Sequence, residues 1–393
     1  MSGDLARLED RWATGALMSP HGDTASVYDL AVALSHIGGA RVELTPRAQG
    51  VLDVVESPDH IVFVLVDGLG MNLVERLPED AFFRRSVAME LRTVYPSSTA
   101  PALTTLATAE WPASHSVTGW WLFLPSAAVT ATILPFTERF SDSRLSRGLA
   151  QDAFPAQGML GAFARDVAVY MPRAIAASVY STYAAGGNQC IGWGSLANAV
   201  DLITSRVELA LSPTYSYLYV PFVDAAQHVH GPFDAAVTKT LRQVQSQIGR
   251  LAARLGARAR IVVSADHGVT PPDVIHTWDR TEPLIALLRF PPSGEPRAPC
   301  FHVREGKLAE FFDMFRQRYG NAFALLTLDQ ADSCNLFGRQ GMSDETRRRL
   351  GDAVGIALGA DVLLYEPAPA LANMKGFHGG MLPDEMRVPL IVA

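Results

Sequence analysis

Three continuous runs of apolar, largely β-branched residues stand out along the chain. They cover residues 60–66, 215–223 and 260–264. Runs of this length without polar alternation are typical of parallel strands that are buried on both faces. Polar residues follow each run closely, and the first acidic ones are Asp67, Asp224 and Asp266. We therefore expect three buried strands whose carboxyl ends each present an acidic side chain.

Helical patterns alternate with these runs. Residues 26–37 carry apolar side chains at near-helical spacing, and residues 235–255 combine that spacing with a charged face that includes Lys239. Strands that alternate with helices are typical of α/β folds. We therefore expect a mostly parallel central sheet flanked by helices. Sites in such folds form beyond the carboxyl ends of the strands, where the three aspartates fall.

The same patterns divide the chain into three parts. Residues 1–55 read as a helical lead-in packed on the core, and the proline-punctuated residues 271–340 read as a smaller inserted cap. The α/β core would then comprise residues 56–270 and 341–393. Three further elements are expected: a helix over 307–319, a helix and a returning strand over 353–364, and a last core strand over 388–393.

Composition and charge restrict the class of protein and its partners. Of the 393 residues, 48% are hydrophobic and 19% are charged, which fits a globular protein with a large core. The net charge of −7 argues against general nucleic-acid binding, which favours basic surfaces. A small anionic substrate stays compatible with this charge, because bound cations reverse the local field.

The expected location is the cytoplasm. The three cysteines, Cys190, Cys300 and Cys334, are widely spaced and form no CxxC motif, which favours a reducing compartment. The amino-terminal segment is charged and lacks the apolar stretch of a signal peptide. Prolines interrupt the most apolar long stretch, residues 117–136, so we interpret it as buried structure or a pocket wall and expect no membrane span.

Two pairs of residues have the spacing of metal ligands. Asp224 and His228 are four positions apart, which places both side chains on one face if a helix follows the strand. Asp266 and His267 are adjacent at the end of their strand. Each pair alone has an ordinary explanation as a surface, loop or capping group. Their convergence at one sheet edge favours ligation instead.

Two further residues complete this candidate set. Asp67 ends the first strand, and His378 lies in the loop GFHGG, whose glycines permit close approach of the backbone. Two adjacent divalent ions would then have three ligands each and an open position for substrate or water, which is a catalytic pattern. Mixed nitrogen and oxygen ligands favour zinc, with manganese as the alternative.

Thr99 is the candidate nucleophile. It lies in the Ser/Thr/Pro-rich turn PSSTAP, and a helix is expected to begin near Pro101. Backbone N–H groups at a helix start bind phosphate, although the simpler role of Ser and Thr at this place is to cap the helix. A hydroxyl flanked by two divalent ions is suited to phosphoryl transfer.

Aromatic residues gather just after this turn. They are Trp111, Trp120, Trp121 and Phe123. Trp120 and Trp121 are the candidate substrate contacts, since such rings can stack on a base or cover an apolar alcohol. Aromatic side chains in an apolar run can equally belong to the core.

The chain resembles the alkaline phosphatase superfamily, in its type I phosphodiesterase/nucleotide pyrophosphatase branch. The resemblance rests on five motifs in order: VLVDGLG (64–70), the stretch YPSSTAPALTTLATAEWPASHSVTGW (95–120), VDAAQHVHGP (223–232), SADHG (264–268) and GFHGG (376–380). It implies an alkaline-phosphatase-like α/β fold. At the position of an asparagine that diesterases of this kind usually carry, this chain has Trp120.

The resemblance also implies roles for individual residues. Thr99 matches the nucleophile. One zinc site, which also holds the nucleophile oxygen, matches Asp67, Asp266 and His267, and the other matches Asp224, His228 and His378. His115 matches no ligand and is expected to be structural.

The expected activity is therefore metal-dependent hydrolysis of phosphodiester or pyrophosphate bonds in a small, nucleotide-like molecule, through a phospho-threonine. Two alternatives use the same scaffold: a phosphomonoesterase and a phosphonate (C–P) hydrolase. A metal-stabilised binding protein is the alternative outside the enzymes, and an intact Thr99 speaks against it.

Overall fold

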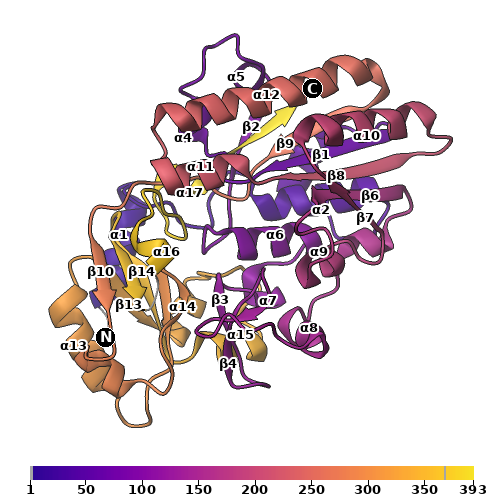
Figure 1. Ribbon diagram of the computed structural model, residues 1–393. Helices are drawn as coiled ribbons and strands as arrows, with labels where there is room; N and C mark the ends of the chain where they lie inside the picture. Colours follow the sequence, from indigo (N-terminus) through magenta and orange to yellow (C-terminus); the bar gives the residue numbers. More distant parts are fainter. Residues whose placement is uncertain (1–2, 367–368) are drawn as a thin grey trace.

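The computed structural model describes residues 3–366 and 369–393, and its centre is a seven-stranded sheet (Figure 1). The strand order is β2 (Val87–Arg92), β16 (Arg387–Val392), β9 (Arg260–Ser264), β1 (His60–Val66), β8 (Thr214–Val220), β6 (Asp166–Pro172) and β7 (Gln189–Trp193). The last five run parallel, whereas β16 is antiparallel to both of its neighbours. The expected mostly parallel sheet is confirmed.

Burial explains why the strands lie where they do. Every residue of β1 after His60 is buried, and β8 and β9 are nearly as enclosed, as continuous apolar runs require. The three strands are neighbours, with β1 between β9 and β8. Their carboxyl ends therefore meet at one edge.

Helices cover both faces of this sheet (Figure 1). On one side lie α10 (Leu196–Leu209), α11 (Phe222–His230) and α12 (Ala235–Leu255), and on the other lie α2 (Val27–Gly38), α3 (Pro46–Val55), α6 (Thr99–Thr108) and α9 (Val179–Ala184). α12 presents an apolar stripe to the core, including Val237, Val244 and Leu251. α2 begins with a capping box between Ser26 and Asp29.

A second sheet of seven strands lies beside the first. Its order is β13 (Phe323–Thr327), β14 (Ala353–Ala357), β12 (Ala298–Phe301), β11 (Ser293–Glu295), β3 (Trp121–Leu124), β4 (Val129–Thr132) and β5 (Thr137–Glu138). It therefore combines strands from residues 121–138 with strands from residues 293–357. The two segments join where Gly294 pairs with Trp121.

The remaining elements are short or lie around the second sheet. β10 (Ile275–Trp278) pairs with β15 (Val362–Tyr365). The helices are α1 (Gly3–Ala13), α4 (Met71–Val74), α5 (Phe82–Arg85), α7 (Pro112–His115), α8 (Ala150–Ala153), α13 (Leu308–Tyr319), α14 (Leu328–Ser333), α15 (Asp344–Leu350), α16 (Pro369–Ala372) and α17 (Pro383–Met386). No helix in the described part of the chain is long and apolar enough to cross a membrane.

The expectation of a helix within residues 353–364 is wrong. This segment forms two buried strands, β14 and β15, which are separated by the turn at Gly359. A short apolar run does not distinguish a buried strand from a buried helix, so pairing with β12 and β13 decides the outcome.

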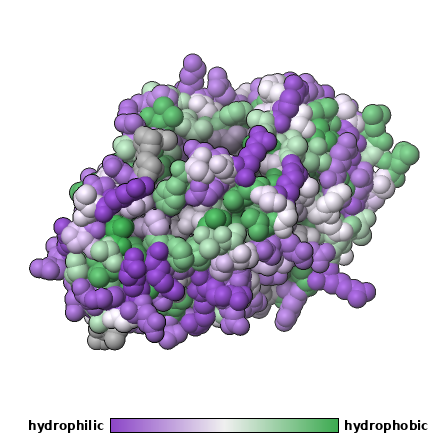
Figure 2. Space-filling model, turned by 60° about the horizontal axis from the view of Figure 1, so that its bottom comes forward, coloured by the Kyte–Doolittle hydropathy of each residue, from purple (hydrophilic) through white to green (hydrophobic). Residues whose placement is uncertain are grey.

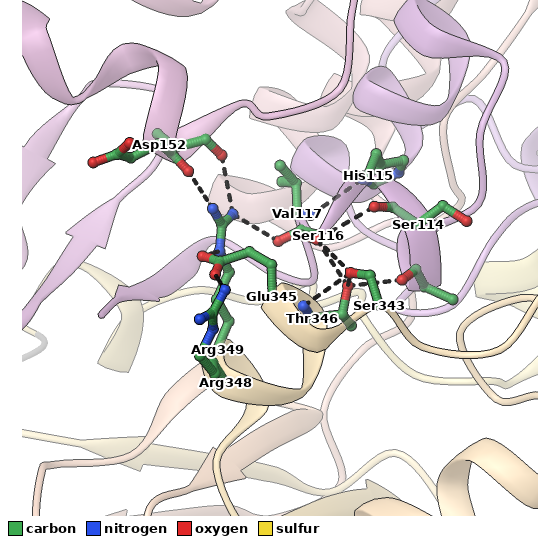
Figure 3. Close-up of polar contacts among 12 residues, drawn as sticks. Ser114, His115, Ser116, Val117, Asp152, Ser343, Glu345, Thr346, Arg348 and Arg349 are labelled. Atoms are coloured by element: carbon green, nitrogen blue, oxygen red, sulfur yellow. Dashed lines mark hydrogen bonds and ion pairs between the residues drawn. The ribbon is translucent and has the colours of Figure 1, made fainter. Parts of the chain in front are cut away.

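A buried polar network joins α15 to the segment that follows α7 (Figure 3). The guanidinium of Arg349 donates to the carbonyls of Ser116 and Ala153 at 2.9 and 3.0 Å, and it forms an ion pair with Glu345. The hydroxyls of Ser116 and Thr346 lie 2.9 Å apart. This network ties α15 to the segment after α7 and to the end of α8.

Candidate metal centre

The site lies at the carboxyl edge of the central sheet. Asp67 follows β1, and Asp266 and His267 follow β9. Asp224 and His228 project from α11, which begins directly after β8. The backbone N–H of Asp67 donates to the carbonyl of Val220, and that of Asp224 donates to the carbonyl of Asp67, so the two strand ends are tied together.

Ligand atoms from separate elements converge in two groups. One group is Asp224, His228 and His378, and the other is Asp67, Asp224 and His267; within each, the ligand atoms lie within 4.8 Å of one another. The first is the set expected for one metal. The second group contains Asp224 in the place where Asp266 was expected. Asp266 lies next to this group, since its Oδ2 is 3.4 Å from His267 Nε2. Asp224 therefore lies between two adjoining groups.

Each of the three aspartates has one oxygen held by the protein and one left over. Asp67 Oδ2 accepts the hydroxyl of Tyr219, and Asp266 Oδ1 accepts the backbone N–H groups of Gly68 and His267. Asp224 Oδ2 pairs with His228 Nε2 at 3.1 Å. The second oxygen of each carboxylate is buried and lacks a hydrogen-bond partner among the described residues. Buried polar atoms are normally satisfied, so three orphaned carboxylate oxygens indicate a cation site.

Two of the candidate histidine ligands, His228 and His267, are each held through Nδ1 by a backbone carbonyl. Nδ1 of His228 donates to the carbonyl of Gly376 at 2.8 Å, and Nδ1 of His267 donates to the carbonyl of Gly268 at 3.0 Å. In the neutral form of each ring, Nε2 is then the nitrogen with a lone pair, as in histidines that bind metals. His378 stacks on His267 with ring centroids 3.8 Å apart, and its buried Nδ1 has no hydrogen-bond partner in the described chain.

The charges of these groups influence one another strongly. Burial, together with repulsion from Asp266 and Asp224, raises the pKa of Asp67 well above its ordinary value. Burial opposes ionisation of His228, but the charge of Asp224 outweighs it and raises the pKa of His228 to about 9. Such a concentration of buried carboxylates is unfavourable without positive charge beside it. Divalent cations fit this donor set, and nitrogen with carboxylate oxygen suits zinc.

Thr99 is the first residue of α6, and its hydroxyl faces the candidate metal ligands. Thr99 Oγ1 lies 3.1 Å from His267 Nε2, and the residue is 7% exposed. Ser98 precedes the helix, but its hydroxyl does not cap it, because it donates to Glu295 instead. The preceding Ser97 donates to the carbonyl of Gly380 at 2.7 Å, which joins this turn to the loop that carries His378.

A cavity of about 910 Å³ opens over the site. Its lining includes Thr99, the candidate ligands Asp67, Asp224, His228 and His378, and a largely apolar wall that contains Leu134, Phe136, Met171, Tyr180 and Phe377. Figure 2 shows hydrophobic side chains gathered near the middle of one face of the molecule, with hydrophilic ones around them. The cavity therefore suits a ligand with an anionic end and an apolar or aromatic remainder.

Only part of the aromatic cluster reaches this cavity. Trp120 and Trp121 line it, and Trp121 is covered by Arg139, whose guanidinium carbon lies 3.6 Å from the ring centroid. Trp111 stacks on Tyr28, and Phe123 packs against Phe290, away from the lining. Trp120 is the more exposed of the two tryptophans.

His115 has no place among the ligands. It is fully buried, its Nε2 lies 3.0 Å from the hydroxyl of Thr105, and its Nδ1 accepts the N–H of Val117. Burial lowers the pKa of His115 to about 3, so the ring is neutral. It supports the turn between α7 and β3.

Two residues of the site had no signal in the sequence. Tyr219, which donates to Asp67, is one of several aromatic residues in β8. Glu295 lines the cavity and accepts from Ser98, although its segment is rich in glycine and proline and shows no strand pattern. Burial raises the pKa of Glu295 to about 7.

Comparisons with known proteins identify the family and the fold. The profile of the type I phosphodiesterase/nucleotide pyrophosphatase family matches residues 61–289. No curated protein matches the chain in sequence. Among solved structures, murine ectonucleotide pyrophosphatase/phosphodiesterase 5 superposes with a TM-score of 0.60 at 14% identity, covering 84% of this chain and 87% of that one.

Two further structures of this kind share the fold. The human ectonucleotide pyrophosphatase/phosphodiesterase 5 gives a TM-score of 0.65 at 13% identity. An inactive variant of the murine protein in complex with AMP gives 0.62 at 15% identity. Both alignments cover 84% of this chain and 87% of the other. The alkaline-phosphatase-like α/β fold expected from the sequence is thereby confirmed.

Proposed function

Because the chain belongs to the type I phosphodiesterase/nucleotide pyrophosphatase family and is a hydrolase of phosphoric esters, we propose that Thr99 carries out its reaction as a nucleophile. The bond that it breaks is a phosphodiester or pyrophosphate bond in a small molecule. One observation carries this proposal: the Thr99 hydroxyl lies 3.1 Å from His267 Nε2, beside carboxylate oxygens that have no other partner among the described residues.

The family is metal-dependent, and the arrangement of side chains supports two ions. Asp67, Asp266 and His267 would hold the ion next to Thr99, and Asp224, His228 and His378 would hold the other. Bound there, the ions would lower the pKa of the threonine hydroxyl and neutralise charge that develops on the phosphoryl group. Zinc is the proposed metal, since the ligands combine imidazole nitrogen with carboxylate oxygen.

The reaction proceeds in two displacements at phosphorus. Thr99 Oγ1 attacks, and a bond from Oγ1 to phosphorus forms while the bond to the leaving oxygen breaks; the proton of Oγ1 passes through solvent to that leaving oxygen. Water then attacks the same phosphorus and the bond to Oγ1 breaks, and one proton of this water returns to Thr99. The position of Thr99 at the start of α6 directs backbone N–H groups toward the phosphoryl oxygens.

A nucleotide-like substrate fits the lining of the cavity, and it resembles the ligand of one structural relative. A solved structure of the murine relative is an inactive variant in complex with AMP. In this chain one cavity is lined by Thr99, by an apolar wall and by Trp120, which is half-buried. We propose that Trp120, and Trp121 beside it, contact the group that the phosphoryl oxygen carries. Stacking of a base on such a ring is worth about 1–3 kcal/mol.

A substrate screen with zinc-loaded protein tests this function. The panel contains bis-p-nitrophenyl phosphate, dinucleotides joined by pyrophosphate, nucleotide-linked diesters and p-nitrophenyl phosphate, each with wild type and with Thr99→Ala. The proposal expects turnover of diesters or pyrophosphates that disappears in the variant. A preference for the monoester above about tenfold, which corresponds to 1.4 kcal/mol, would identify a phosphomonoesterase instead.

A further inference from the structure

Glu295 is a buried acidic residue beside the nucleophile turn. It is the last residue of β11, is 3% exposed and lines the same cavity as Thr99. Its Oε1 accepts the backbone N–H of Trp120 at 2.6 Å and the hydroxyl of Ser98 at 2.5 Å. The carboxyl group is therefore held next to the residue that precedes Thr99.

The surrounding backbone fixes this position. Gly294 pairs with Trp121 across the second sheet, and a Cβ on Gly379 would lie 3.1 Å from the Cβ of Glu295. Glu295 thus sits between the strand that carries Trp121 and the loop that carries His378. Two donors bind Oε1, whereas Oε2 has no hydrogen-bond partner among the described residues and belongs to a residue of the cavity wall.

No cationic side chain pairs with this carboxylate in the described chain. Arg297 is the nearest arginine in sequence, but its guanidinium donates to other groups. Its Nε donates to Glu385 at 2.7 Å, and its terminal nitrogens donate to the carbonyls of Gly359 and Asp361. Arg144 and Arg147 are the arginines that line the cavity, and both are exposed. The cavity thus places an acid, and no buried arginine or lysine, beside the position of the phosphoryl group.

We propose that Glu295 selects substrates by charge, and that it disfavours phosphoryl groups with two negative charges relative to those with one. This inference rests on the proposed function. Two divalent cations would be balanced by Asp67, Asp224, Asp266 and the alkoxide of Thr99, so Glu295 adds a negative charge in excess. Coulomb repulsion scales with the product of the charges, so a monoester dianion is repelled more than a diester monoanion.

Glu295→Gln is the matched test, because glutamine has the same shape and its amide oxygen still accepts from Ser98 and Trp120. At about pH 9 the wild-type carboxyl is ionised, since its pKa is about 7. We expect kcat/KM for p-nitrophenyl phosphate to rise by about tenfold or more relative to that for bis-p-nitrophenyl phosphate. Glu110→Gln, which neutralises a half-buried acid outside the cavity lining, is expected to leave this ratio unchanged.

Equilibrium binding provides a readout without turnover. In zinc-loaded Thr99→Ala protein, calorimetry compares the affinities of the two esters with and without Glu295→Gln. The monoester is expected to gain about tenfold over the diester when the charge is removed. A role of Glu295 in folding alone would change both affinities together and would overturn the inference.

A second pair of variants tests the inference independently in case Glu295→Gln does not fold. Glu295→Asp keeps the charge and is expected to keep the preference for diesters, whereas Glu295→Ala is expected to lose it. Equal ratios in these two variants would overturn the inference. If the wild type hydrolyses diesters and the ratio in Glu295→Gln equals that of the wild type, the charge role is wrong and the proposed function stands. If the wild type hydrolyses neither ester, the proposed function is wrong, and this inference falls with it.

Discussion

The hydroxyl of Thr99 and the imidazole of His267, which are 168 positions apart in sequence, lie 3.1 Å from each other. Thr99 begins α6, whereas His267 follows β9. The contact therefore joins a helix start to a strand end across the carboxyl edge of the sheet. It places a hydroxyl where the orphaned oxygens of Asp67 and Asp266 already converge.

The first prediction concerns the nucleophile. Thr99→Ala should lower kcat for the best diester by about a thousandfold or more, because the covalent step and the cations act as a unit. Thr99→Ser should retain part of the activity. Zinc content, measured by elemental analysis, should stay close to that of wild type in both variants. Thr240→Ala, which removes a hydroxyl from α12, is the control and should keep the wild-type rate.

The second prediction concerns metal content. Wild-type protein should bind about two zinc ions per chain, as expected for a two-metal phosphoryl-transfer site. His378→Ala should lose the ion shared with Asp224 and His228, and Asp266→Ala should lose the one next to Thr99. His276→Ala removes a histidine that pairs with Asp361, and it should retain both ions. Loss of both ions in each ligand variant would leave the division into two sites without support.

The third prediction concerns removal of the metals. A chelator should lower the thermal stability of the wild type, because three buried aspartates would then repel one another without a cation. Addition of zinc should restore it by mass action. The midpoint of thermal unfolding, followed with and without zinc, measures this effect. Asp224→Asn should reduce the dependence on zinc, since Asp224 contributes to both groups of ligand atoms.

The fourth prediction concerns a buried ion pair behind the site. Arg297 and Glu385 are both fully buried and form a bidentate ion pair. Oε1 of Glu385 also accepts the backbone N–H of Gly380 at 2.8 Å. Arg297→Ala should lower the free energy of unfolding by about 3–5 kcal/mol, because it leaves Glu385 buried without a counterion. Denaturant unfolding measures the change. Arg304→Ala, at an exposed position, should stay within about 0.5 kcal/mol of the wild type.

The fifth prediction concerns pH. Since burial lowers the pKa of His115 to about 3, the unfolded chain binds a proton that the folded chain excludes between that pH and the ordinary histidine value of about 6.5. Stability should therefore fall as pH drops through this window, by up to about 1.4 kcal/mol per pH unit from this group. His115→Gln should be less stable than wild type at neutral pH. Its free energy of unfolding should also fall less between about pH 6.5 and 4, and an equal fall in both proteins would contradict this.

The sequence predicted the elements that depend on long local patterns. β1, β8 and β9 follow from unbroken apolar runs, and the joint placement of Asp224 and His228 follows from four-residue spacing on α11. The order of the motifs identified the family, which the profile match confirms. These features are recognisable because each is encoded within a short segment.

Features that depend on distant pairing had no such signal. The contact of Glu295 with Trp120 exists only because β11 pairs with β3, and both strands are short. The strands of residues 353–365 were mistaken in part for a helix for the same reason: their partners lie elsewhere in the chain. The proximity of Asp224 to Asp67 and His267 likewise arises from the adjacency of β1 and β8 in the sheet.

The most direct test of covalent catalysis by Thr99 is the stereochemical course at phosphorus. In water labelled with a heavy oxygen isotope, zinc-loaded wild-type protein would hydrolyse a diester whose phosphorothioate centre is chiral. The labelled oxygen makes the phosphorus of the product chiral, and its configuration would be determined. Each in-line displacement inverts the centre, so attack by Thr99 followed by attack of water predicts overall retention. Inversion would show a single displacement by water and would contradict the account.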